Sequence, residues 1–197
     1  MWAKVESGSV TEIYTSPKSL EIGDVQYPRN IFQLWSESEL NAIGLYTVQI
    51  DNTNYKDQEF YINTSQSFTF GSGKVTASYG SATAKSLTDT SETVDGITTT
   101  ILGLKSVHKN NVNSQASVLL QKHDWMSIRE AEGGTDMPSN IKTWRASVRT
   151  KANEMCTQID NAANVDALAA LYVYSNTGTE SDPVYTRPLG EFPSEPS

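Results

Sequence analysis

Few side chains in this sequence could act as a nucleophile or general base near neutral pH. The chain has only two histidines, His108 and His123, and a single cysteine, Cys156. His123 is followed directly by Asp124, but adjacent residues at the start of a helix point apart and cannot form the contact of a catalytic triad. The G-x-S-x-G nucleophile elbow is also absent. We therefore predict no catalytic residue, with both histidines in capping or surface positions and Cys156 as a small core residue.

Two segments resemble ion- or phosphate-binding loops but lack residues that such loops need. Residues 51–59 are rich in Asp and Asn, yet an EF-hand requires Gly at its sixth position and this segment has none there. Residues 71–74 read Gly-Ser-Gly-Lys, but Val75 stands where a P-loop has the Ser or Thr that binds magnesium. Both are expected to be turns. We predict no metal site, no cofactor and a non-enzymatic protein.

The first 80 residues have the patterns of a small β-rich region. Ser7-Gly8-Ser9 interrupts an alternating stretch, which is typical of a β-hairpin. Ser36 and Glu39 have the spacing of a capping box for a short helix that Gly44 would end, before a strand over 45–50. A second hairpin is expected from strands 59–70 and 74–79. Its candidate core residues are Phe60, Ile62, Phe68, Phe70 and Val75.

Residues 81–105 are rich in Ser and Thr and have few apolar side chains. Asp95-Gly96 is a turn signal, and the β-branched run 98–101 favours a strand. We expect either a linker or a ribbon that faces solvent, and its function is not indicated by the sequence.

Residues 106–172 are expected to form a helical hairpin, and the fold class is therefore α+β. Its second helix has Pro138 near its start, with Thr135 or Asp136 as cap. Between the two long helices, Asp124 would cap a short helical turn, and Trp125 would fold back on the preceding helix and contact Trp144. The apolar stripe of the second helix is Ile141, Trp144, Val148, Ala152, Met155 and Ile159.

Residues 165–172 should form a last helix, followed by an acidic, Pro-containing tail at 173–197. A segment of this composition would be disordered in isolation, so we expect the tail to order only along a neighbouring surface.

The net charge of −8 opposes binding to nucleic acid or to an anionic membrane surface. A single cysteine allows no internal disulfide, and neither a signal peptide nor a membrane span is visible. The sequence thus favours synthesis and folding in a cytoplasm.

Two parts of the chain resemble bacteriophage proteins. The order and spacing of nine residues in the helical region are similar to the "LL..tDW…R…P…(W/Y)R..LR" pattern of bacteriophage tail-assembly chaperone domains. Residues 2–10 resemble the "yAkVenG.V" opening of small phage tail and tail-fibre-associated proteins, and elements at 27–28, 40, 44 and 46–48 follow in the same order. The nine residues are Leu119, Leu120, Asp124, Trp125, Arg129, Pro138, Trp144, Arg145 and Arg149.

The resemblance implies a non-enzymatic phage protein that acts by protein–protein contact with other tail or tail-fibre proteins. The chain could also form a homo-oligomer. It could be a structural virion component of the tail, tail fibre or baseplate, made in the host cytoplasm. It could instead be a transient tail-fibre assembly chaperone. A glycan hydrolase is a more distant alternative, since no recognisable motif places two carboxylates. The expected partner-binding residues are Trp125, Arg129, Trp144, Arg145 and Arg149.

Overall fold

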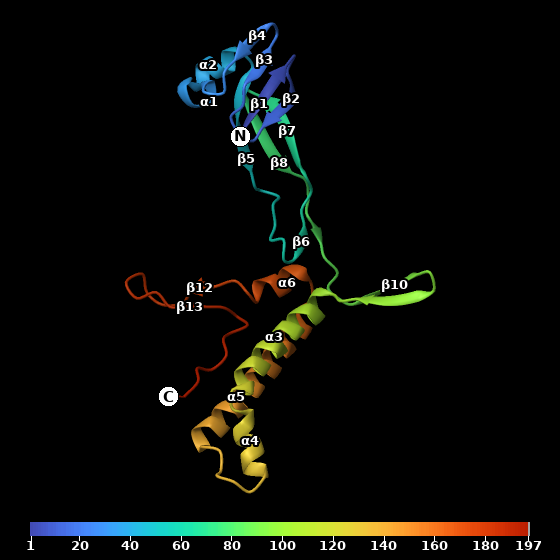
Figure 1. Cartoon of the computed structure of the whole chain (residues 1–197), viewed down its shortest axis with the longest axis vertical. Coiled ribbons are helices and arrows are strands. Elements are labelled where there is room, and N and C mark those ends of the chain that lie inside the picture. Colours follow the sequence, from blue (N-terminus) through green and yellow to red (C-terminus); the bar gives the residue numbers. More distant parts are fainter. Residues whose placement is uncertain (197) are drawn as a thin grey trace. The chain divides into compact units, whose positions relative to one another are not determined.

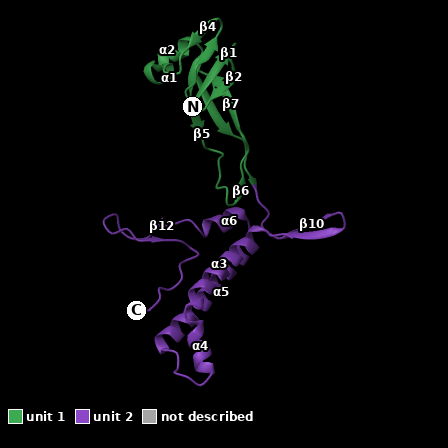
Figure 2. Ribbon diagram, viewed as in Figure 1, with its two compact units in different colours: residues 1–83 green, residues 84–197 purple. Residues whose placement is uncertain are grey.

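The protein has an α+β fold that divides into two compact units, Met1–Thr83 and Ala84–Ser197 (Figures 1 and 2). The computed structural model describes residues 1–196. The first unit is rich in strands, and the second contains the long helices, as predicted. Among the described residues, no helix has the length and apolar character that crossing a membrane requires.

A five-stranded sheet forms the centre of the first unit, in the order β2-β1-β5-β8-β7. Strands β5 and β8 are parallel, and the other neighbours are antiparallel. Both predicted hairpins are present. Ser7-Gly8 and Ser72-Gly73 have positive φ at each position, which is the two-residue turn that suits the twist of paired strands. The strands are β1 (Trp2–Glu6), β2 (Ser9–Tyr14), β5 (Leu45–Asp51), β7 (Gln66–Gly71) and β8 (Lys74–Tyr79).

Two short helices and a small hairpin cover part of this sheet. They are α1 (Ile31–Leu34), α2 (Glu37–Ala42), and the pair β3 (Leu20–Ile22) and β4 (Val25–Tyr27). The capping box of α2 is confirmed: the Ser36 hydroxyl accepts from the Glu39 N–H at 3.3 Å, and the Glu39 carboxylate accepts from the Ser36 N–H at 2.7 Å. Gly44 ends the helix with φ +82°, where a Cβ would lie 2.9 Å from the Val5 carbonyl oxygen.

The buried side chains of the first unit form two clusters. One joins the sheet to the short helices, and the other lies among the central strands. The first consists of Tyr14, Leu20, Ile31, Phe32, Leu40 and Leu45, and the second of Ala3, Val48, Val75 and Ala77.

The predicted strand over 59–70 is not continuous, and this part of the prediction was wrong. The N–H groups of Phe60 and Tyr61 bond to the Asp57 carbonyl, and the Asn63 side chain bonds both backbone groups of Lys56, so the chain turns here. The short strand β6 (Tyr61–Ile62) pairs instead with β9 (Thr83–Ala84). Phe60 and Val75 are buried, Phe68 and Phe70 partly so, but Ile62 is exposed.

The Ser/Thr-rich segment forms a free-standing ribbon, one of the two predicted outcomes. Strands β10 (Thr90–Val94) and β11 (Ile97–Ile101) pair only with each other within the described chain, and every residue in them is exposed. In Figure 1 the ribbon projects away from the helices of its own unit.

The helical hairpin consists of α3 (Leu104–Gln121) and α5 (Ser139–Asn161), which lie side by side (Figure 1). The short helix α4 (Asp124–Ala131) connects them, and α6 (Val165–Ala170) follows with Asn164 as its cap. Every residue of the predicted apolar stripe of α5 is buried. On α3 the buried residues are Leu104, His108, Val112 and Ala116, spaced by four.

The predicted caps of α4 and α5 were wrong. Asp124 is the first residue of α4, not its cap, and its carboxylate accepts from Arg145 instead. Pro138 precedes α5 without a side-chain cap. Thr135 and Asp136 contribute their backbone carbonyls, which accept from Arg129 at 2.9 and 3.4 Å. The carbonyls of this turn are therefore satisfied by Arg129 of α4, and the Asp124 carboxylate by Arg145 of α5.

The C-terminal tail orders along the helices of its own unit. Strands β12 (Ser175–Asn176) and β13 (Tyr185–Thr186) form a small exposed hairpin, and the chain then returns to the helices. Leu189 is buried, and its N–H donates to the Leu171 carbonyl at 3.0 Å. We call residues 187–196 the strap. The surface that orders it belongs to this chain, so a partner is not needed for this purpose.

Candidate docking surface on the helical hairpin

Arg145 holds the three helices of the hairpin together. Its side chain is buried on α5, and its guanidinium donates to the Asp124 carboxylate at 2.7 Å and to the Leu120 carbonyl. A buried guanidinium needs such partners, because an uncompensated charge in the interior is strongly destabilising. One side chain therefore fixes the end of α3 and the start of α4 against α5.

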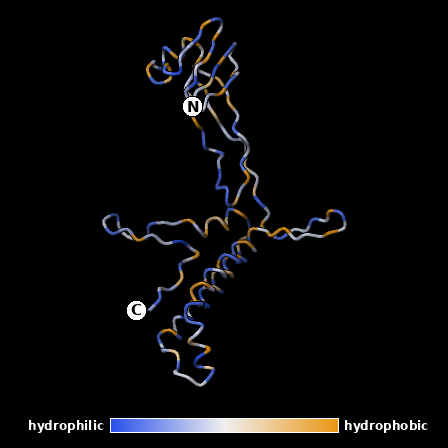
Figure 3. The backbone as a smooth tube through the Cα atoms, in the orientation of Figure 1, coloured by the Kyte–Doolittle hydropathy of each residue, from blue (hydrophilic) through white to orange (hydrophobic). Residues whose placement is uncertain are grey.

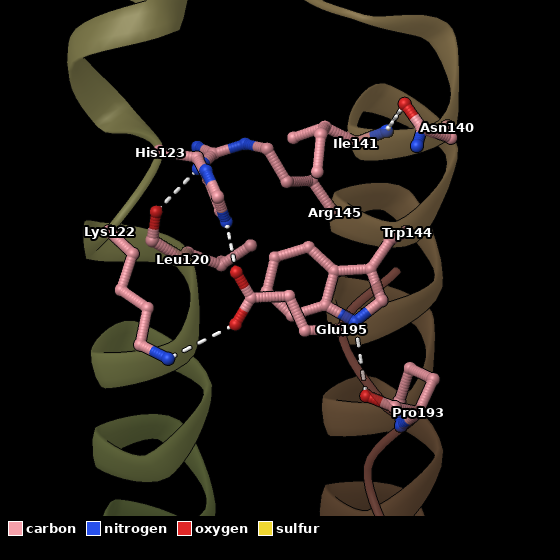
Figure 4. Close-up of polar contacts among 9 residues, drawn as sticks. All are labelled: Leu120, Lys122, His123, Asn140, Ile141, Trp144, Arg145, Pro193 and Glu195. Carbon is pink, nitrogen blue, oxygen red and sulfur yellow. Dashed lines mark hydrogen bonds and ion pairs between the residues drawn. The ribbon is translucent and has the colours of Figure 1, made fainter. Parts of the chain in front are cut away.

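Trp144 lies beside Arg145 and is also buried, with 5% of its surface exposed. Its predicted burial is confirmed, but its neighbours are not those expected. The indole N–H donates to the Pro193 carbonyl at 3.0 Å, and the His123 ring meets the indole edge-on with centroids 5.5 Å apart (Figure 4). The strap thus satisfies the polar atom of the largest side chain on α5.

Glu195 fixes the end of the strap to the end of α3. Its carboxylate accepts from Lys122 Nζ at 3.0 Å and lies 2.7 Å from His123 Nε2 (Figure 4). Lys122 and then His123 lower the pKa of Glu195 below its ordinary value, because both contacts favour the charged carboxylate. The strap is therefore attached by a buried leucine, an indole hydrogen bond and a surface charge pair.

The outer end of α4 is fixed by a second set of contacts. Lys142 on α5 pairs with Glu130 at 2.7 Å, which lowers the pKa of that carboxyl group. The backbone at Gly134 packs closely on Arg129, whose Cγ would lie 2.8 Å from a Cβ at this position. Together with the bonds from Arg129 to the Thr135 and Asp136 carbonyls, these contacts hold α4 at both ends.

One face of α4 presents large side chains to solvent. Trp125 is 53% exposed and Ile128 is 58% exposed. The Arg129 guanidinium lies over the Trp125 ring, 4.9 Å from its centroid. Residues three and four apart share one side of a helix, so the three side chains form one surface. We call Trp125, Ile128 and Arg129 the α4 face. Trp125 does not fold back on α3 to contact Trp144 as predicted; its ring is half exposed, and His123 and the Pro193 carbonyl lie beside Trp144 instead.

The structure separates the five predicted partner-binding residues. Trp125 and Arg129 belong to the α4 face, whereas Trp144 and Arg145 are buried and bonded within the chain. Arg149 is exposed and lines a recess of about 420 Å³ between α3 and α5. Sequence reasoning missed Pro193 and Glu195, which lie far from the hairpin in sequence and carry no motif.

The histidines and the cysteine differ in environment. His108 is buried against Tyr172 with ring centroids 4.8 Å apart, so the prediction of a surface or capping role was wrong for it. Its spacing of four from Val112 was the signal for a position on the buried face of α3. Cys156 is partly buried, and this burial raises the pKa of its thiol. Its Sγ lies 3.8 Å from the Asn113 side-chain oxygen.

The two segments that resemble ligand-binding loops are turns. Asp51 accepts from the N–H and hydroxyl of Thr53 at 2.9 and 2.5 Å, and Gly71 faces Lys74 across the β7–β8 turn. Within residues 1–196, no group of three His, Cys, Asp or Glu side chains is placed to hold a metal ion.

No family model matches the chain, and neither a curated protein nor a solved structure matches it.

Proposed function

We propose that this chain is a non-enzymatic bacteriophage tail protein that acts by protein–protein contact through the α4 face. The observation that carries the proposal is the exposed Trp125, stacked with Arg129 on a helix fixed at both ends. Tryptophan and arginine are the residue types that most often dominate binding energy in protein interfaces. The partner proposed is another tail or tail-fibre protein, which rests on the resemblance of this region to phage tail-assembly domains.

The contacts below the α4 face support a binding role because they limit the entropy lost on association. A side chain that is already positioned loses less freedom when it meets a partner. Arg129 is held by the Thr135 carbonyl and also lies on the Trp125 ring. The chain's net charge of −8 makes nucleic acid an unsuitable partner for this surface.

The experiment compares purified phage particles that carry the wild-type chain with particles from a Trp125→Ala, Ile128→Ala variant. Quantitative mass spectrometry of gradient-purified virions measures the copies of this chain per particle. We expect the wild type in the tail fraction and a several-fold loss in the variant. Tyr185→Ala is the matched control, because Tyr185 is also an exposed aromatic residue, at 65%, on the separate β12–β13 hairpin.

The same experiment distinguishes a retained tail component from an assembly chaperone. A chaperone would be abundant in infected cells and absent from virions, and the variant would lower the yield of fibred particles. Retention of the variant at wild-type copy number, with normal fibres, would contradict the α4 face as the docking surface. Release of soluble sugars from host glycans by the purified chain would contradict the non-enzymatic proposal.

A further inference from the structure

The β10–β11 ribbon is amphipathic, although both of its faces are exposed. The register pairs Val94 with Ile97 and Thr90 with Ile101, and residues two apart on a strand share a face. One face therefore carries all the apolar side chains of the ribbon, with exposed fractions of 58% for Val94, 70% for Ile97 and 50% for Ile101. The same face also carries Thr90, Glu92 and Thr99. Figure 3 shows apolar stretches at both ends of the ribbon. The opposite face is formed by Ser91, Thr93, Thr98 and Thr100.

The base of the ribbon is fixed to the start of α3. The Gly103 N–H donates to the Asp89 carboxylate at 2.8 Å, and the Leu104 N–H donates to the Ser86 carbonyl at 2.9 Å. A Cβ at Gly103 would lie 2.3 Å from the Thr88 backbone, so only glycine permits this approach. These contacts fix the base of the ribbon to the second unit, and they therefore determine the direction in which its apolar face meets solvent.

The hairpin geometry determines which backbone groups point outward. Asp95 and Gly96 both have positive φ and form a two-residue turn, so the flanking pair Val94 and Ile97 is hydrogen-bonded. Hydrogen-bonded and non-hydrogen-bonded pairs alternate along two antiparallel strands, so Thr93 and Thr98 form a non-hydrogen-bonded pair. Their hydroxyl oxygens lie 2.9 Å apart, in agreement with the closer side chains of such pairs. Thr98 and Thr100 consequently direct their N–H and C=O groups to the outer edge of β11.

The sequence of β11 is symmetric about its central residue. It reads Ile-Thr-Thr-Thr-Ile from either end, and it has no charged side chain. Exposed edge strands are usually protected from pairing by charges, proline or a bulge. An antiparallel pair of two β11 strands centred on Thr99 would place Ile97 opposite Ile101 of the second copy. It would also place the outward groups of Thr98 opposite those of Thr100, as an antiparallel ladder requires.

We propose that β11 is a self-association edge: two copies of this chain pair their β11 strands about a twofold axis through Thr99. The result is a four-stranded antiparallel sheet in which the apolar faces of both ribbons join. A two-stranded ribbon is marginally stable by itself, and added strands with a shared apolar face stabilise it. A twofold axis also makes the interface self-complementary and closes the assembly at two copies. This pairing involves only the ribbon and is independent of the protein that contacts the α4 face.

The other edge of the ribbon is unsuited to the same pairing. The central residue of β10 is Glu92, so two antiparallel β10 strands would place like charges directly opposite each other, which is destabilising. Only one edge of the ribbon is therefore compatible with self-pairing, and a dimer is expected rather than a growing sheet.

Sedimentation analysis of the full-length chain tests the proposal. We expect a concentration-dependent dimer with twice the 21.6 kDa mass of the chain. Thr100→Pro removes an outward N–H without removing a bond inside the ribbon, and should raise the dimer dissociation constant about tenfold or more. Ser91→Pro is the matched control, because Ser91 faces Thr100 across the ribbon and points to the β10 edge. This control should dimerise like the wild type.

A cross-linking experiment tests the register. In the proposed dimer the Thr99 residues of the two copies form a non-hydrogen-bonded pair. Such pairs have a Cα separation of about 4.5 Å, which a disulfide can span. In a Cys156→Ser background, Thr99→Cys should form a covalent dimer under mild oxidation. Thr90→Cys, on the same face of the outer strand, should not. A monomeric wild type, equal dissociation constants for the two proline variants, or equal cross-linking at both positions would overturn the proposal.

Discussion

The β7–β8 and β10–β11 hairpins have the same design and opposite environments. Each has a two-residue turn that ends in glycine, with positive φ at both turn positions. In the first hairpin, Val75 and Ala77 are completely buried because β8 also pairs with β5 inside the five-stranded sheet. In the second hairpin every residue is exposed, including Val94 and Ile97. A turn and two strands therefore specify a hairpin, but whether its apolar face is buried depends on a neighbouring element.

A matched pair of substitutions gives the largest expected contrast between the two hairpins. Val75→Asp would place a carboxylate in a site from which water is excluded, and should lower the free energy of unfolding by about 3–5 kcal/mol. Val94→Asp makes the same chemical change at an exposed position and should alter the free energy of unfolding by less than about 0.5 kcal/mol. Urea denaturation followed by circular dichroism measures both. Equal destabilisation by the two variants would show that the ribbon is buried against another part of the molecule in solution.

The two tryptophans of the helical hairpin extend the comparison to helices. Trp144→Ala should cost about 3–5 kcal/mol, because it leaves a cavity and removes the donor to the Pro193 carbonyl. Trp125→Ala should cost less than about 1 kcal/mol, since its ring is half exposed and contacts Arg129 on the surface. Thermal melting of the two variants against wild type is the measurement. A Trp125 variant that melts as low as the Trp144 variant would place Trp125 in the core and remove it from the docking surface.

The smallest expected effect concerns the attachment of the strap. Lys122 and His123 lower the pKa of Glu195 below the ordinary 4.5, so the carboxylate is held more strongly in the folded chain than in the unfolded one. The contribution of the Glu195 carboxylate to the stability of the folded chain is complete above about pH 4.5. This contribution is lost as the pH falls through the lower pKa of Glu195 in the folded chain. Amide chemical shifts of residues 187–196 should therefore move in acid, without global unfolding. Glu195→Gln should remove this titration, and an unchanged profile in that variant would exclude Glu195 as its source.

Local patterns predicted the elements that depend on neighbours in sequence. The turns at Gly8, Gly73 and Gly96 require a positive φ that glycine adopts at little cost, and each was visible as a turn signal. The Ser36 and Glu39 capping box formed as its spacing indicates. The burial of α5 followed from its three- and four-residue spacing, including that of Trp144. In each case the interaction spans a few residues, so the sequence contains both partners side by side.

Errors arose where a partner came from a distant part of the chain. Asp124 has the type and position of a helix cap, but Arg145 offers it a buried guanidinium, a stronger partner than a backbone N–H at a helix end. The strand predicted through Asn63 is instead interrupted by a local turn, in which Asn63 bonds back to Lys56, and the short strand β6 pairs with the distant β9. The five expected partner-binding residues were predicted as one group, and only the structure separates exposed Trp125 from buried Trp144.

The sequence by itself determined the α+β class, the hairpins, the amphipathic helix α5 and the composition of the C-terminal tail, because these depend on local periodicity, turn chemistry and charge. Only the tertiary structure decided that the tail becomes a strap on the helical hairpin, through Leu189, the Pro193 carbonyl and Glu195. It also decided that the ribbon pairs with no other strand of the described chain and stays exposed. The physical reason is the same for both: burial and long-range hydrogen bonds belong to pairs of surfaces, and a sequence pattern describes only one surface of each pair.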